Sequence, residues 1–226
     1  MGVDKMAKVA LIHTVKSVLN TFEDKVKEAI GDVVVVNTLD EYLASDPAEK
    51  GEFTVENMNR LFSFIKNAEI AQADVIVVTC STLSPTVEKI KPFIKVPVIT
   101  IDEAMIKKAV ECGTKVTIMA TAESTIEPTK FGLLREAEKL NKHLELSIVV
   151  CHEAFDAIRA GDVKHHDELL KQRALKVKQQ DVVVLAQASM AHMQNIIEKI
   201  CGCTVLSSPN LCINQLKQTL INLKKI

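Results

Sequence analysis

The residues best suited to chemistry in this chain follow the end of a short apolar run. In "DVIVVTCSTLSP" at 74–85, a run of β-forming residues is followed by Cys80, and then by Ser81 and Thr82. A thiol can act as a nucleophile or as an acid-base group, and the hydroxyls beside it can donate and accept hydrogen bonds. Free cysteine is also among the most often buried residue types, so a place in the core is the simplest alternative. The elements that position Cys80 decide between the two.

The other cysteines and histidines form no known metal or nucleotide motif. The six cysteines lack a CxxC pair, and "CGC" at 201–203 has no partners at zinc-finger spacing. The seven glycines form neither GxGxxG nor GxxxxGK[ST]. The segment 164–180, which begins "KHHDELL", has the pattern of a surface helix, so its histidines are expected on a solvated face. We therefore expect no metal and no cofactor.

The composition suits a globular protein, and the charge balance leaves small polar metabolites as its more natural partners. The 226 residues are 47% hydrophobic, which suits one large domain or two smaller ones. The 28 basic and 29 acidic residues nearly balance, so neither nucleic acid nor membrane is expected as a partner. The start "MGVDKMAKVALIH" does not have the pattern of a signal peptide, and no apolar stretch approaches the roughly 18 residues of a membrane span. We expect a cytoplasmic protein with reduced cysteines.

Eight short apolar runs alternate with helical patterns along the chain. Continuous apolar strands separated by helices predict parallel sheets with both faces covered, and hence an α/β protein. The runs lie at 8–13, 32–37, 74–79, 96–100, 115–120, 146–151, 181–186 and 204–207.

The runs repeat. "KVALIHTVKS" from Lys8 matches "KVTIMATAES" from Lys115, and "DVIVVTCSTL" from Asp74 matches "DVVVLAQASM" from Asp181, both at a distance of 107 residues. Several matches in order at one spacing indicate an internal duplication. We expect two similar lobes, 1–102 and 103–208, related by pseudo-twofold symmetry, with a C-terminal helix at 209–226 that packs on the first lobe.

The ends of the strands are the expected ligand site. In open parallel sheets, ligands bind beyond the carboxyl ends of the strands, where helix starts offer unpaired N–H groups. If the lobes face each other, these ends meet in one cleft suited to a small carboxylate. The alternative is that the hydroxyls only cap helices, a role that serine and threonine commonly fill. The residues at these ends are His13, Thr14, Cys80, Ser81 and Thr82 in the first lobe and Thr121, Thr125, Gln187, Ala188 and Ser189 in the second.

These features resemble the aspartate/glutamate/hydantoin racemase superfamily, whose relatives include arylmalonate decarboxylase and maleate isomerase. The resemblance rests on two tandem lobes, the cysteine before "ST", and the stretches "MATAEST", "CHEAFDAIRAGD" and "VVVLAQASMAHM". It implies proton transfer at a carbon next to a carboxylate, carried out by two cysteines on opposite faces of the substrate. It implies neither pyridoxal phosphate nor metal, and a dimer would be an ordinary assembly for such a protein.

The chain departs from this pattern at one position. The repeat places Gln187 where the resemblance implies a second cysteine opposite Cys80, and an amide does not titrate usefully. We therefore predict a racemase or isomerase with Cys80 as acid-base group or nucleophile. His13 is predicted to activate the thiol, and the remaining strand-end residues to bind the substrate. Two alternatives stay open: a decarboxylase of malonate-type acids that uses one thiol, and a protein that binds small carboxylates without catalysis.

Overall fold

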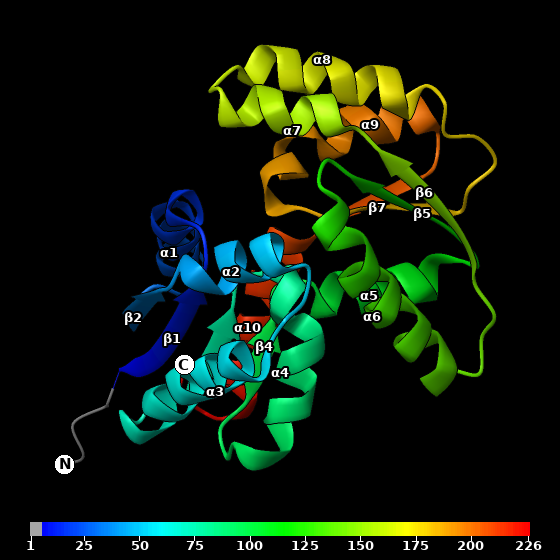
Figure 1. The fold of residues 1–226 in the computed structure, drawn as a ribbon. Coiled ribbons are helices and arrows are strands. Elements are labelled where there is room, and N and C mark those ends of the chain that lie inside the picture. The colour runs from blue at the N-terminus through cyan, green and yellow to red at the C-terminus, as the bar shows by residue number, and fades with distance from the viewer. Residues whose placement is uncertain (1–5) are drawn as a thin grey trace. The chain divides into compact units, whose positions relative to one another are not determined.

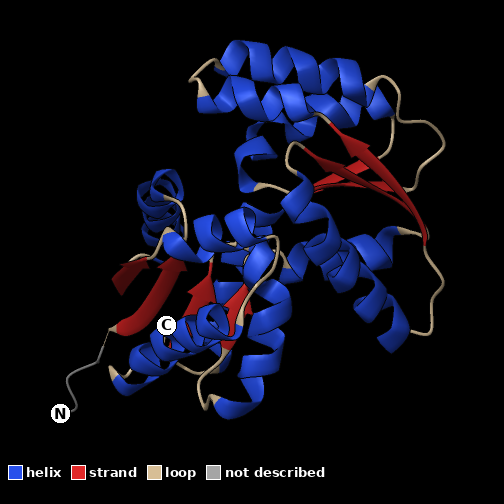
Figure 2. Cartoon of the chain, in the orientation of Figure 1, coloured by secondary structure: helices blue, strands red, loops and turns tan. Residues whose placement is uncertain are grey.

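The structure, a computed structural model, describes residues 6–226. The chain divides into two compact units (Figure 1). The first unit extends to Ile101 and also contains Cys212–Ile226, and the second is Asp102–Leu211. Each unit is built around its own four-stranded sheet (Figure 2).

The first unit holds a parallel sheet with the strand order β2-β1-β3-β4. Its strands are β1 (Ala7–His13), β2 (Val33–Leu39), β3 (Val75–Val78) and β4 (Val98–Thr100). Because β1 lies beside β3, the connections that leave these two strands diverge at their carboxyl ends. This is the switch point at which α/β sheets bind ligands.

The second unit repeats this sheet, with the order β6-β5-β7-β8. Its strands are β5 (Lys115–Ala120), β6 (Glu145–Val150), β7 (Val182–Leu185) and β8 (Thr204–Ser207), all parallel. The α/β class and the two similar lobes with parallel sheets that the sequence predicts are confirmed.

Helices connect the strands in both units, and none in the described part of the chain has the length and apolar character needed to cross a membrane. In the first unit they are α1 (Lys16–Ile30), α2 (Tyr42–Lys50), α3 (Val55–Ile70) and α4 (Ser84–Ile90), with 3-10 turns η1 (Ser81–Leu83) and η2 (Lys91–Phe93). In the second they are α5 (Glu103–Cys112), α6 (Ile126–Lys139), α7 (His152–Arg159), α8 (Val163–Ala174) and α9 (Gln194–Cys201), with η3 (Glu123–Thr125) and η4 (Ala188–Met193). The helix α10 (Ser208–Asn222) begins in the second unit and continues into the first.

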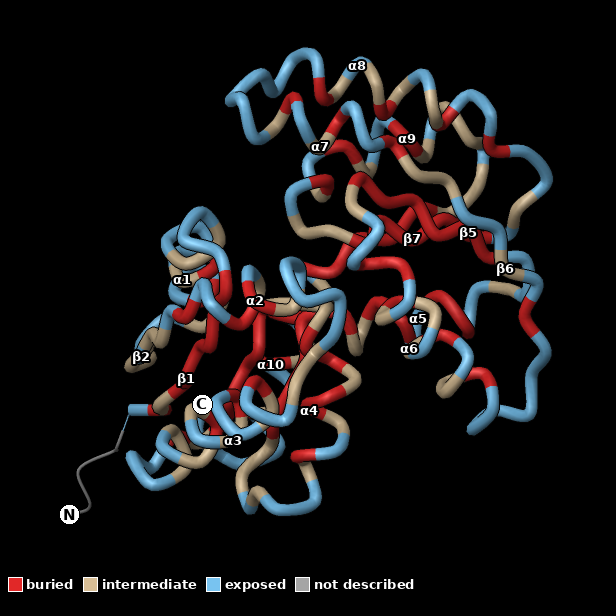
Figure 3. Tube along the Cα trace, viewed as in Figure 1, coloured by how far each residue is buried: buried red, intermediate tan, exposed pale blue. Residues whose placement is uncertain are grey.

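Helices cover both faces of the second sheet. Ile118 and Val184 pack with α5 and α6 on one face, while their neighbours Met119 and Leu185 pack with α7, α8 and α9 on the other. Successive residues of a strand point to opposite faces, so a strand between two helix layers must be apolar throughout. The central strands are accordingly buried along their length, while the edge strand β6 is largely exposed (Figure 3).

The internal duplication has a structural counterpart in the pairing of the central strands. Val9 pairs with Val75 in the first sheet, and Val116 pairs with Val182 in the second. The aspartates that begin the matching runs make equivalent hydrogen bonds: Asp74 accepts the Lys8 N–H at 2.8 Å, and Asp181 accepts the Lys115 N–H at 2.9 Å. The repeated aspartate therefore holds the start of one central strand against the start of the other.

Candidate functional site

Cys80 lies at the switch point of the first sheet. Cys80 follows β3 and directly precedes η1. The Thr79 N–H donates to the carbonyl oxygen of Ile12 at 2.9 Å, which holds this segment beside the end of β1. The thiol is free and half-buried, and its Sγ lies 2.9 Å from the Thr82 Oγ1. Cys80 also contacts the apolar cluster of this unit. The position therefore combines a partly exposed sulfur with a hydroxyl that can exchange a proton with it.

His13 ends β1 and is fully buried. Its Nδ1 lies 2.8 Å from the Thr79 Oγ1, and its Nε2 lies 3.0 Å from the Asn37 Oδ1. The Asn37 amide in turn donates to Glu23. Burial lowers the pKa of His13, although Asn37 and Glu23 oppose that shift. The ring is therefore neutral at pH 7, and a neutral ring donates from one nitrogen and accepts at the other.

The hydrogen bonds of Asn37 determine which nitrogen of His13 carries the proton. Because the Asn37 NH2 donates to Glu23, its Oδ1 is the acceptor for an Nε2–H, which leaves Nδ1 as an acceptor toward the Thr79 hydroxyl. That hydroxyl also donates to the Ile12 carbonyl at 3.1 Å, so its one proton is shared between two acceptors. Among the described contacts, the ring thus bonds the residue before Cys80 and not the thiol. The activation of Cys80 by His13 stays a prediction, and its geometric basis is indirect, through Thr79.

Two threonines that the duplication pairs share an unusual property. Thr14 follows β1 and Thr121 follows β5, and their side chains are 3% and 1% exposed. Within the described residues, neither hydroxyl oxygen has a hydrogen-bond partner. A buried polar atom without a partner costs about 1–3 kcal/mol, and such atoms are rare in native proteins. A ligand oxygen reaching either position would supply the missing bond.

The side-chain oxygen of Gln187 accepts hydrogen bonds from backbone N–H groups at the end of β5. Its Oε1 accepts the backbone N–H of Thr121 at 2.6 Å and that of Ala122 at 3.3 Å. Two N–H donors on one side of the side-chain amide identify the atom facing them as oxygen, so the NH2 group points elsewhere. A cysteine at this position would have only a weak acceptor to offer these donors. Gln187 thus satisfies two backbone N–H groups at the end of β5 with its own oxygen.

Of the remaining predicted residues, Thr125 makes a hydrogen bond within its own turn, and the others lie in the 3-10 turns that follow β3 and β7. The Thr125 hydroxyl donates to the Ala122 carbonyl at 2.9 Å, and although Thr125 stands at the N-cap of α6, its side chain makes no capping hydrogen bond there. Ser81 lies in η1 beside Cys80. In η4, Ala188 is half-buried and Ser189 is exposed. The structure brings Cys80 together with Thr82 in one unit and Gln187 together with Thr121 in the other.

A family model described as Asp/Glu/hydantoin racemase matches residues 12–216. The chain belongs to this family. The match covers both units, from the end of β1 to α10. It therefore includes every candidate residue described above, among them Cys80 and its repeat counterpart Gln187.

Solved structures of racemases have the same fold as this Asp/Glu/hydantoin racemase family member. A glutamate racemase isoform from Bacillus anthracis is 16% identical and superposes over 97% of this chain and 83% of its own, with a TM-score of 0.75. The aspartate racemase of Picrophilus torridus is 16% identical over 94% of both chains, with a TM-score of 0.69. The allantoin racemase of Klebsiella pneumoniae is 15% identical over 96% of this chain and 89% of its own, with a TM-score of 0.63. A search of curated proteins finds no significant match.

One sequence prediction for this racemase-family chain is wrong. The solvated face expected for 164–180 fails at His166, which is fully buried in α8. The helix period contained the signal, because His166, Leu170 and Ala174 lie four residues apart and form one buried stripe. The partners of His166 could not be read in this way, because one of them, His192, lies on a different element.

Proposed function

We propose that the protein is a cofactor-independent racemase or isomerase that acts at a carbon next to a carboxylate of a small amino acid or related acid. Cys80 is the proposed acid-base group or nucleophile. The observation that supports this most is the position of its half-buried Sγ at the switch point of a parallel sheet, 2.9 Å from the Thr82 hydroxyl. Family membership supports the reaction class. The proposed ligand-binding residues are Thr14, Ser81, Thr82, Thr121, Thr125, Gln187, Ala188 and Ser189.

The proposed step is removal of the proton on the carbon next to the carboxylate by the Cys80 thiolate. The electron pair of the broken C–H bond moves into an enolate-like system, whose oxygens need hydrogen-bond donors. The unpartnered hydroxyl of Thr14, which lies in the same unit as Cys80, is a suitable donor. The thiol proton exchanges with solvent, and the carbon then regains a proton from the thiol.

Gln187 limits what this step can produce. An amide side chain neither removes nor supplies a proton near neutral pH. If Cys80 returns the proton to the face from which it took it, the substrate exchanges its hydrogen with solvent and keeps its configuration. Inversion requires a second acid, and the proposal assigns that role to no residue. Exchange that is faster than inversion is the signature expected of a site with one thiol.

The test is solvent-deuterium exchange over a panel of amino acids, hydroxy acids, malonates and hydantoins. Mass spectrometry follows incorporation of deuterium, and chiral chromatography follows inversion. We expect exchange into at least one class of substrate, its loss in Cys80→Ala, and its retention in Cys112→Ala, which removes an exposed cysteine from the end of α5. Exchange that survives Cys80→Ala would refute the proposed role of the thiol.

The same panel tests the two alternatives. Loss of CO2 from a malonate would identify a decarboxylase, in which the electrons of the broken C–C bond take up a proton from the thiol. This alternative is supported by the sequence, in which Cys80 is matched by Gln187 at the repeat distance. Binding of a carboxylate without exchange or turnover would identify a binding protein and would overturn the enzymatic proposal.

A further inference from the structure

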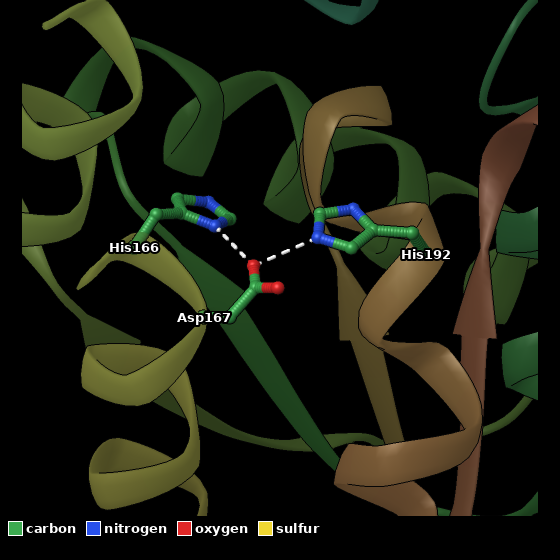
Figure 4. A group of neighbouring side chains, drawn as sticks. All are labelled: His166, Asp167 and His192. Atoms are coloured by element: carbon green, nitrogen blue, oxygen red, sulfur yellow. Dashed lines mark hydrogen bonds and ion pairs between the residues drawn. The ribbon is translucent and has the colours of Figure 1, made fainter. Parts of the chain in front are cut away.

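A cluster of three side chains, none of them among the predicted site residues, lies in the second unit. His166 and Asp167 belong to α8, and His192 belongs to η4. The Asp167 Oδ1 lies 2.8 Å from the His166 Nδ1 and 2.7 Å from the His192 Nε2 (Figure 4). The two rings stack, with centroids 5.8 Å apart and planes inclined by 25°. One carboxylate oxygen therefore bridges two imidazoles from different elements.

The exposure of the cluster changes from one member to the next. The His166 side chain is 0% exposed, the Asp167 side chain 23% and the His192 side chain 45%. Within the described residues, the His166 Nε2 is buried and has no hydrogen-bond partner. Among the described residues, the only hydrogen-bond partner of this buried imidazole is the shared carboxylate, and the other side of the cluster is open to solvent.

The ligand chemistry of these groups is that of a transition-metal site. Two imidazole nitrogens and a carboxylate oxygen, one atom from each residue, all lie within 4.8 Å of one another. Zinc binds such atoms at about 2.0–2.2 Å, and catalytic zinc sites use three protein ligands with a fourth position open. Ligand atoms around such an ion lie about 3 Å or more apart, so the two hydrogen bonds must lengthen by a few tenths of an ångström. The exposed His192 side chain can move by that amount.

We propose that His166, Asp167 and His192 bind a divalent transition-metal ion, best matched by Zn²⁺, in place of the protons that they now share. The ion enters from the side of His192 and Asp167, which solvent reaches. It ties α8 to η4, the turn that begins directly after Gln187. Oxygen-seeking ions such as Mg²⁺ do not match a site with two imidazoles.

The electrostatics of Asp167 suit a cation at this point. The Asp167 carboxylate faces both imidazoles and supplies the negative charge that a metal ion needs. Metal ions bind neutral imidazole, so affinity for the ion is expected to fall as the solution is acidified.

The test is titration of chelator-treated protein with Zn²⁺ by calorimetry, with Co²⁺ as a spectroscopic probe. The background carries Cys80→Ser, Cys201→Ser and Cys203→Ser, because free thiols also bind zinc. We expect one ion per chain and a cobalt spectrum without a sulfur charge-transfer band. His192→Gln and Asp167→Asn should weaken binding by more than the roughly 10–100-fold seen when an outer partner of a metal site is lost. His165→Gln, which changes an exposed neighbour on the same helix, should leave the affinity unchanged.

A second readout is independent of affinity. Hydrogen exchange of η4 (Ala188–Met193) should slow when Zn²⁺ is added, while exchange of η1 (Ser81–Leu83), the matching turn of the first unit, should not. Equal zinc affinity in the His192→Gln and His165→Gln proteins would overturn the proposal and leave a hydrogen-bonded cluster. A protein that does not bind zinc more tightly than millimolar would overturn the proposal as well. Neither result depends on Cys80, so failure here is separate from failure of the proposed function.

Discussion

Replacing Gln187 by methionine tests whether its side-chain oxygen stabilises the end of β5. Methionine has an unbranched side chain of similar length to glutamine, but it is apolar and offers no strong acceptor. The substitution removes bonds to the N–H groups of Thr121 and Ala122. Each bond contributes about 1 kcal/mol net, and an amide left without a partner costs more. Because Gln187 is only half-buried, water recovers part of the loss, and we expect a decrease of about 1–3 kcal/mol in the free energy of unfolding.

Two measurements check this value. Urea titration followed by circular dichroism should show a lower midpoint, and hydrogen exchange of the Thr121 and Ala122 amides should accelerate by about 10–100-fold if local opening becomes easier by 1.4–2.7 kcal/mol. The control is Gln172→Met, which makes the same chemical change at an exposed site on α8. If both variants match the wild type in midpoint and in exchange at the two amides, the inferred role of the Gln187 oxygen is refuted.

Three further predictions concern His13, Thr14 and two closely packed glycines. Because burial lowers the pKa of His13, the unfolded chain takes up its proton first, so stability should fall as pH drops from about 7.5 through 6.5 toward the lowered pKa; His13→Gln should flatten this dependence in urea titrations. Thr14→Val should leave the ligand-free protein equally stable, or more stable by up to about 1 kcal/mol, and should weaken carboxylate binding by about 5–10-fold in calorimetry; a clear loss of stability would mean that the hydroxyl has a protein partner. Gly113→Ala places a Cβ against the Asp181 side chain and should lower stability by about 1–3 kcal/mol, whereas Gly132→Ala, where the Cβ meets the flexible end of Ile106, should cost less than about 1 kcal/mol; equal thermal midpoints would contradict this contrast.

The fold could be predicted because burial on both faces leaves a plain mark in the sequence. A central strand such as Val182–Leu185 has no polar face, and such runs recur at the repeat distance. The same pattern hides which strands lie at the edges. Val33–Leu39 reads like a central strand, although it lies at the edge of its sheet and none of its residues is fully buried. Edge position depends on the order of strands in space, which the apolar pattern of one strand does not encode.

The candidate site was predicted in its positions but not in its contacts. Backbone topology sets which residues follow β1, β3, β5 and β7, so Thr14 and Gln187 could be placed from the repeat. The direction of a side chain depends on its rotamer and neighbours. The sequence therefore could not show that Gln187 turns its oxygen onto backbone amides, or that His13 bonds Thr79. His192 and Asp167 are 25 residues apart, and only the packing of η4 on α8 brings them together.

The path of α10 has a consequence for how the chain is made. The first unit needs Cys212–Ile226, which follow the whole of the second unit in sequence. In this segment, Lys217 Nζ donates to the Ala29 carbonyl at 2.9 Å and Lys225 pairs with Asp74 at 2.8 Å. During synthesis the second unit has all of its residues while the first still lacks its last helix. The first unit is thus translated first but completed last. Until α10 is synthesised, the surface of the first unit that α10 covers is exposed to chaperones and proteases.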